Sequence, residues 1–167
     1  DKNGLSKEAY AFIAGILSEI RSMAAVTNPL VNSYKRLVPG YEAPIYLAWS
    51  IANRSPLIRV PSERGDKTRI ELRPPDPASN PYLKLAAFIN AGLDGIEKGM
   101  RAPKCAEINL FELSDEERAE AGIERMPESL GEALDIMEKS DFMKRALGEH
   151  IFKTFIASKR QEWNDYT

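Results

Sequence analysis

Residues 28–82 read NPLVNSYKRLVPGYEAPIYLAWSIANRSPLIRVPSERGDKTRIELRPPDPASNPY, and arginines, a few carboxylates and turn-forming residues collect in this stretch. If its segment TRIELR at 68–73 forms an extended strand, Arg69, Glu71 and Arg73 project from one face. Two guanidinium groups beside one carboxylate suit a site that holds phosphate or carboxylate oxygens next to a divalent cation. The stretch therefore predicts a strand with an anion-binding face.

Two more arginines, Arg54 and Arg59, lie just upstream in the segment NRSPLIR at 53–59. Leu57 and Ile58 give this segment strand propensity and a way of anchoring to a core. We therefore expect both arginines to be held on rigid elements.

A turn is predicted in YKRLVPGYEAP at 34–44, where Pro39 and Gly40 separate Arg36 from Glu42. This pattern places Glu42 on a loop. A mobile carboxylate beside fixed arginines suggests a gate.

The composition is that of one ordinary globular domain. The 167 residues are 43% hydrophobic and 29% charged, enough for a single core. We expect a cytoplasmic protein without a membrane partner, because no apolar run approaches the roughly 20 residues that cross a bilayer and the first residues lack a signal-peptide pattern. The single cysteine, Cys105, cannot form an internal disulfide. Because the sequence begins with Asp1 rather than methionine, we expect it to be part of a longer protein.

The charge is unevenly distributed along the chain. Residues 34–73 hold eight Lys and Arg against four Asp and Glu, so with a net charge of −2 the remainder carries −6. A nucleic-acid binder is more often basic overall, with aromatic residues among its cations. The local surplus of positive charge therefore favours a small anionic ligand over nucleic acid.

Helical spacing of apolar residues predicts one helix over 5–25, started by Ser6, and a second over 81–98. We expect the second helix to bury an apolar stripe against the sheet. The stripe consists of Leu83, Leu85, Ala86, Ile89, Leu93 and Ile96.

The remaining pattern completes an α+β fold. Segment 45–52 is β-prone and, with the two arginine-bearing segments, predicts an antiparallel or mixed sheet of three strands covered on one side by the two helices. A short helical turn is expected in SDEERAEAG at 114–122. A helical carboxy-terminal region follows, with helices over 129–138, 140–147 and 148–163.

Several motifs in order are specific enough to indicate a family. NPLVNSYKRLVPGYEAPIYLAWSIANRSPLIRVP, TRIELRPPDPASNPYLKLAA and AGLDGI closely resemble the carboxy-terminal half of the catalytic domain of bacterial type I glutamine synthetases. The resemblance runs from LSKEAYAFIAGIL to ALGEHIFKTFIASKRQEW, which is nearly the whole chain. It implies that residues 1–167 are one part of that domain, without the amino-terminal β-grasp domain and the first half of the catalytic domain.

The resemblance implies ATP-dependent ligation of ammonia to L-glutamate through a γ-glutamyl phosphate, with Mg²⁺ or Mn²⁺, in a dodecamer with shared active sites. It implies that Glu42 is a catalytic flap residue that takes a proton from ammonium, and that Arg54 touches both glutamate and the transferred phosphoryl group. Arg36 and Arg73 would bind glutamate, and Glu71 would ligate metal. The implied ATP contacts, besides Arg54, are Arg59, Asp66, Lys67, Thr68 and Arg69.

Two other functions stay open beside the ligase: a non-catalytic fragment or scaffold member of the family, and a phosphagen-type kinase. Taken one at a time, the arginines are more simply explained as surface ion pairs, and Glu71 as their counter-ion. Multi-metal phosphoryl-transfer sites need several converging carboxylates or histidines, and Glu71 has few beside it. We therefore predict that the isolated chain is inactive as a synthetase and binds Mn²⁺ poorly.

Overall fold

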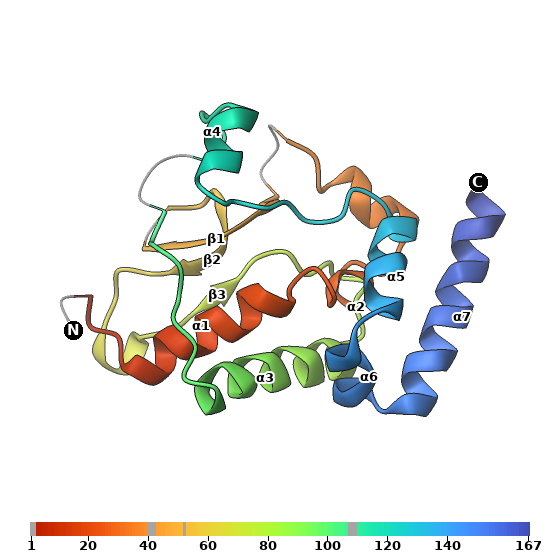
Figure 1. Ribbon diagram of the computed structural model, residues 1–167, viewed down its shortest axis with the longest axis horizontal. Helices are drawn as coiled ribbons and strands as arrows, with labels where there is room; N and C mark the ends of the chain where they lie inside the picture. Colours follow the sequence, from red (N-terminus) through yellow and green to blue (C-terminus); the bar gives the residue numbers. More distant parts are fainter. Residues whose placement is uncertain (1–2, 40–42, 52, 107–109) are drawn as a thin grey trace.

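A computed structural model describes residues 3–39, 43–51, 53–106 and 110–167 of the chain (Figure 1). Its sheet has three strands in the order β1 (Tyr46–Ile51), β2 (Pro56–Val60) and β3 (Glu71–Leu72). Strand β1 runs parallel to β2, and β3 runs antiparallel to it. Together with the helices described below, this mixed sheet confirms the predicted α+β fold.

The first predicted helix is shorter than the spacing of apolar residues suggested. Helix α1 covers Lys7–Glu19 and is capped by Ser6, as expected, but a turn separates it from the short α2 (Ala24–Thr27). Within this turn the Ser22 hydroxyl donates to the Glu19 carbonyl at 2.8 Å. Ser18 makes the same kind of bond to the Gly15 carbonyl inside α1, so this bond alone does not explain the interruption. A 3₁₀ helix, η1 (Val31–Lys35), follows.

The second predicted helix has the expected bounds. Helix α3 covers Pro81–Glu97, and its start is fixed by Asn80, whose side chain accepts hydrogen bonds from the Tyr82 and Leu83 amides. Proline at the first helical position costs nothing, because its missing donor would have no helical partner. Helices α1 and α3 lie on the same side of the sheet (Figure 1).

Small residues bring α1 and α3 into close contact. At the crossing, a Cβ built on Gly15 would lie 2.8 Å from Gly95 Cα, and a Cβ on Gly95 would lie 2.1 Å from the Ala11 carbonyl oxygen. Beside the crossing, the ring of Phe12 covers Gly92. The two backbones therefore pack with no room for larger side chains.

The prediction of which α3 face is buried was wrong. The face against α1 contains the buried residues Ala87, Phe88, Ala91, Gly92 and Gly95. Much of the predicted stripe faces outward instead, with Leu85, Ile89 and Leu93 about half exposed. Close helix packing selects the small face, so the larger apolar residues have no neighbour among the described residues that buries them.

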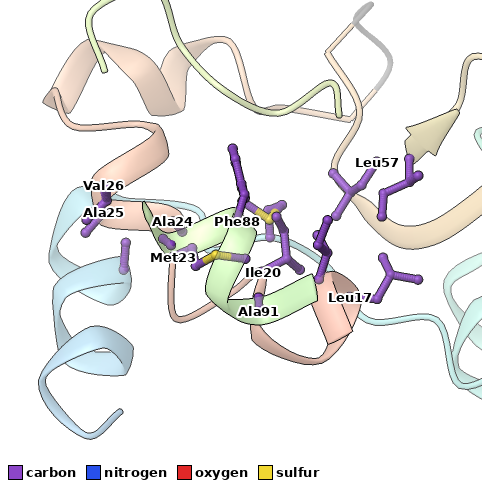
Figure 2. Close-up of a cluster of buried hydrophobic side chains, with 14 of the residues drawn as sticks. Leu17, Ile20, Met23, Ala24, Ala25, Val26, Leu57, Phe88 and Ala91 are labelled. Atoms are coloured by element: carbon purple, nitrogen blue, oxygen red, sulfur yellow. The ribbon is translucent and has the colours of Figure 1, made fainter. Parts of the chain in front are cut away.

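The main core forms where the two helices meet the sheet. Figure 2 shows Leu17, Ile20 and Met23 from the α1 region together with Phe88 and Ala91 of α3 and Leu57 of β2. Leu57, Ile20 and Met23 are fully buried. This core fixes β2, the strand that carries Arg59, against the helical layer.

The third strand is shorter than TRIELR predicts. Residues 68–70 do not pair, and the expectation that they continue the strand was wrong. The register pairs Arg59 with Glu71, so the next positions would bring Pro61 opposite Arg69. Proline has no amide to donate, and the ladder ends there. The connection from β2 contains a 3₁₀ turn, η2 (Gly65–Lys67), in which Gly65 has φ +68°.

The helical carboxy-terminal region follows the predicted pattern closely. Helix α4 (Asp115–Glu120) begins with a capping box formed by Ser114 and Glu117. Serines at 129 and 140 cap α5 (Leu130–Glu138) and α6 (Asp141–Leu147), and Gly148 separates α6 from α7 (Glu149–Tyr166).

Candidate functional site

Glu71 on β3 joins two of the predicted phosphate-binding arginines. The adjacent strand β2 presents Arg59 in register with it, and Arg59 Nη1 lies 2.7 Å from Glu71 Oε2. Arg69 Nη2 lies 3.2 Å from the other oxygen, Oε1. The hydrogen bond from Arg59 and the charge of Arg69 hold the pKa of Glu71 below its usual value, so the carboxylate is ionised at neutral pH.

A second carboxylate, Glu63, completes this group, and sequence reasoning missed it. Its Oε2 lies 2.6 Å from Arg69 Nη1, and this contact is the main reason that the pKa of Arg69 is raised. Glu63 sits on the loop after β2, six residues before Arg69, and no periodic pattern points to such a contact across a loop. The group of Arg59, Arg69, Glu63 and Glu71, which we call the Glu71 cluster, has no net formal charge.

Arg73 and Arg54 meet beside the Glu71 cluster. The Arg73 amide donates to the Leu57 carbonyl at 3.0 Å, which extends the β2–β3 pairing by one bond. Its guanidinium Nη1 donates to the Arg54 carbonyl. Arg54 is exposed in the bend between β1 and β2, so the expectation that a rigid strand carries it was wrong. Arg73 itself holds this bend.

Arg36 is bound to the backbone at the exit from β3. Its Nη2 donates to the Pro74 carbonyl at 2.5 Å, and the buried Asn28 Nδ2 donates to the same oxygen at 2.8 Å. The Asp76 amide also donates to the Thr27 carbonyl at 2.8 Å. Arg36 thus reaches Pro74, the residue next to Arg73 in the chain, from a distant segment.

Asp66, Lys67 and Thr68 are all exposed, on and just after η2. They precede Arg69 directly, so they border the Glu71 cluster. Glu42 lies outside the described residues, and the predicted gate is therefore untested.

Four of the predicted site arginines are thus connected in twos in or beside the β2–β3 pair, Arg59 with Arg69 through the Glu71 carboxylate and Arg73 with Arg54 through the Arg54 carbonyl. A model of the family described as "Glutamine synthetase, catalytic domain" matches residues 1–167. The chain belongs to this family.

Relatives with names align with nearly the whole of this chain. Proteins named glutamine synthetase from Clostridium saccharobutylicum and Methanocaldococcus jannaschii are 58% and 53% identical to it over 99% and 98% of its residues. The chain spans only 38% and 36% of their lengths.

Solved structures share the fold. One titled GmaS/ADP complex, conformation 1, has a TM-score of 0.85 and 35% identity, and the match covers 99% of this chain and 38% of that one. A second, titled apo GmaS without ligand, has a TM-score of 0.83, also at 35% identity. The likeness therefore covers the helical carboxy-terminal region as well as the site.

Whether the described residues could hold a metal ion depends on how their ligand side chains are grouped. Among residues 3–39, 43–51, 53–106 and 110–167, no group of three or more His, Cys, Asp or Glu side chains could hold a metal ion. Both oxygens of Glu71 contact arginines. Within the same ranges, no helix is long and apolar enough to cross a membrane.

Proposed function

We propose that residues 1–167 form the arginine-bearing, carboxy-terminal part of the catalytic domain of an ATP-dependent ligase that joins ammonia to L-glutamate through a γ-glutamyl phosphate. The observation that carries the proposal is the match of the family model to the whole chain. Relatives at 53–58% identity that are named glutamine synthetase favour ammonia as the second substrate. The phosphagen-type kinase is set aside, because the family match includes the segments around Arg54 and Glu42.

In this proposal the two arginine pairs have different ligands. Arg59 and Arg69, with Asp66, Lys67 and Thr68 at their border, contact the phosphates of ATP. Arg54 contacts the transferred phosphoryl group and the glutamate, and Arg73 and Arg36 bind the glutamate carboxylate. Guanidinium groups suit these tasks because they stay charged and bind oxyanions in a bidentate fork.

The contact between Arg73 and Arg54 supports a shared role. Because Arg73 donates to the Arg54 carbonyl, the residue that binds the carboxylate also positions the bend that carries the phosphoryl contact. Electrostatic stabilisation of developing oxyanions depends on such fixed positions. Glu42 is proposed as the flap that closes over the phosphorylated intermediate, because water would otherwise hydrolyse it. The same residue is proposed to accept a proton from ammonium.

The family implies Mg²⁺ or Mn²⁺ together with ATP, and a metal role for Glu71 is part of the proposal for the complete protein only. The described residues do not fit a metal ion by themselves, since both oxygens of Glu71 contact guanidinium groups and no group of three or more His, Cys, Asp or Glu side chains among these residues could hold one. Further ligands must come from parts of the domain outside this chain. A cytoplasmic dodecamer with shared active sites belongs to the same proposal.

The test is a chimaera in which this chain replaces the matched span of the Clostridium saccharobutylicum protein. We expect it to form glutamine from glutamate and ammonium, with ATP consumed in equal amount, while the isolated 167-residue chain forms none. A folded chimaera without ammonium-dependent turnover would support the alternative of a non-catalytic scaffold. Turnover by the isolated chain would contradict the assignment of the missing ligands to other parts of the domain.

A further inference from the structure

The outer face of α3 carries a row of exposed apolar side chains. Tyr82, Leu85, Ile89 and Leu93 are 83%, 52%, 51% and 47% exposed, and we call them the α3 stripe. Their spacing of three or four residues places them on one face of the helix. In Figure 1, α3 lies along the border of the molecule with no labelled element beyond it.

The stripe is unlike a scatter of single exposed residues. Taking about 200 Å² for each large side chain, the four expose roughly 450 Å² of connected surface. Patches of this size on soluble proteins usually mark a contact surface. The opposite face of the helix is already occupied by α1 through Gly92 and Gly95, so α3 cannot rotate to bury the stripe without separating the two backbones.

The exposed area of the α3 stripe distinguishes two candidate partners, a second copy of the chain and a segment of the same polypeptide. If two copies of the chain paired through it alone, they would bury about 900 Å² in total, less than the roughly 1,200 Å² of specific, stable interfaces. A segment of the same polypeptide needs much less area, because linkage gives it an effective concentration near the millimolar range. The relatives provide such segments, since this chain spans only 36–38% of their lengths.

We propose that the α3 stripe is the docking face for an apolar segment of the same polypeptide, in the part of the full-length protein that lies outside these 167 residues. The inference rests on the proposed place of this chain within a longer catalytic domain, but not on catalysis. It also explains why the pattern at 81–98 predicts a buried stripe. In the proposed arrangement, that face is covered in the complete protein.

The experiment measures the reactivity of Ile89→Cys with a maleimide, in the isolated chain and in the chimaera. Peptide mass spectrometry locates the label, so other cysteines do not interfere. Lys98→Cys is the matched control, because Lys98 lies at the end of the same helix, off the stripe, with a side chain that is 63% exposed. We expect the rate at position 89, relative to that at 98, to fall at least tenfold in the chimaera.

An unchanged ratio would overturn the proposal. Protection that disappears when the chimaera is diluted to monomers would also overturn it, because the occupant would then be another copy. If the Ile89→Cys chimaera does not fold, hydroxyl-radical footprinting of Tyr82 and Leu93 in the unsubstituted proteins gives the same comparison. Labelling is read whether or not the chimaera is active, so a failure of this inference is distinct from a failure of the proposed function.

Discussion

The glycine contact between α1 and α3 makes the sharpest prediction about stability. In Gly95→Ala, the new methyl group would lie 2.1 Å from the Ala11 carbonyl oxygen and 2.8 Å from Gly15 Cα. Both atoms are backbone, and they cannot move without moving α1. An ordinary contact needs about 3.4 Å, so the two helices must separate by about 1 Å.

The magnitude follows from two opposing effects. Alanine favours a helix interior over glycine by about 1 kcal/mol. Overpacking a core costs about 1–3 kcal/mol, and a gap of about 1 Å also forfeits up to half of the dispersion energy of each contact along the interface. The packing loss dominates, and we expect Gly95→Ala to lower the free energy of unfolding by about 2 kcal/mol. The melting temperature should fall by about 4–8 °C for a domain of this size.

Gly92→Ala is the matched control, one turn earlier on the same helix. The three atoms nearest to its methyl group would all belong to the ring of Phe12, at 2.1 to 2.4 Å. The ring is half-buried and can turn aside, so we expect a change of less than about 1 kcal/mol. Urea unfolding followed by circular dichroism measures both variants. A Gly95→Ala protein as stable as the unsubstituted chain, or more stable, would refute the close packing of the two helices.

Three further predictions concern the site, pH and a helix cap. In the chimaera, Arg54→Ala and Arg73→Ala should each lower kcat/KM about tenfold to over a hundredfold, because a charge-assisted contact contributes about 1.5–3 kcal/mol. An unchanged kcat/KM would show that the substituted arginine is not part of the site. Hydrogen bonds from Arg145 and, to a smaller extent, Lys98 hold the pKa of Asp94 below its usual value. The ionised Asp94 therefore stabilises the folded chain at pH values above its unfolded pKa of about 4. This stabilisation is lost as the pH falls through the folded pKa. The free energy of unfolding should therefore fall more between pH 6 and pH 3 in the unsubstituted chain than in Asp94→Asn, and equal pH profiles would contradict this. Asn80→Ala should lower the free energy of unfolding, measured by urea unfolding, by about 1 kcal/mol because it removes the cap of α3. Asn80→Asp keeps a capping oxygen, so a loss in Asn80→Ala that is absent from Asn80→Asp would confirm the capping role.

Helix starts could be predicted from sequence because the chemistry that fixes them is local. Ser6 predicts the start of the first helix and Pro81 that of the second, and both helices begin there, with Ser6 and Asn80 accepting hydrogen bonds from amides two or three residues away. The end of the first helix could not be located, because the apolar spacing continues through the turn at residues 20–23. The buried face of α3 could not be predicted either, since it depends on Gly15 of another helix.

Sequence reasoning predicted that Arg59, Arg69 and Glu71 lie near one another, but not how they are connected. Alternation along TRIELR placed Glu71 between two arginines, and the structure confirms the contact with Arg69. The pairing of Glu71 with Arg59 depends on the register of two strands, and the contact with Glu63 depends on the path of a loop. Pro61 ends the strand before Arg69, an effect that appears only once the register is known.

The central claim is that arginines from separate segments form one anion site organised around Glu71. Glu71→Gln removes the charge that pairs Arg59 with Arg69, which leaves one additional net positive charge in the Glu71 cluster. If a phosphate binds about 5 Å away, the gain is about 1 kcal/mol even at the dielectric constant of water, or about fivefold in affinity, and it is larger at a lower effective dielectric constant.

The direct test is calorimetric titration of the isolated chain with inorganic tripolyphosphate. Glu149→Gln is the control, since it makes the same change of charge at an exposed ion pair with Lys153 on α7. We expect Glu71→Gln to bind tripolyphosphate about fivefold more tightly than the unsubstituted chain, and Glu149→Gln to bind it no more tightly. Equal effects of the two substitutions, or weaker binding by Glu71→Gln, would contradict the central claim.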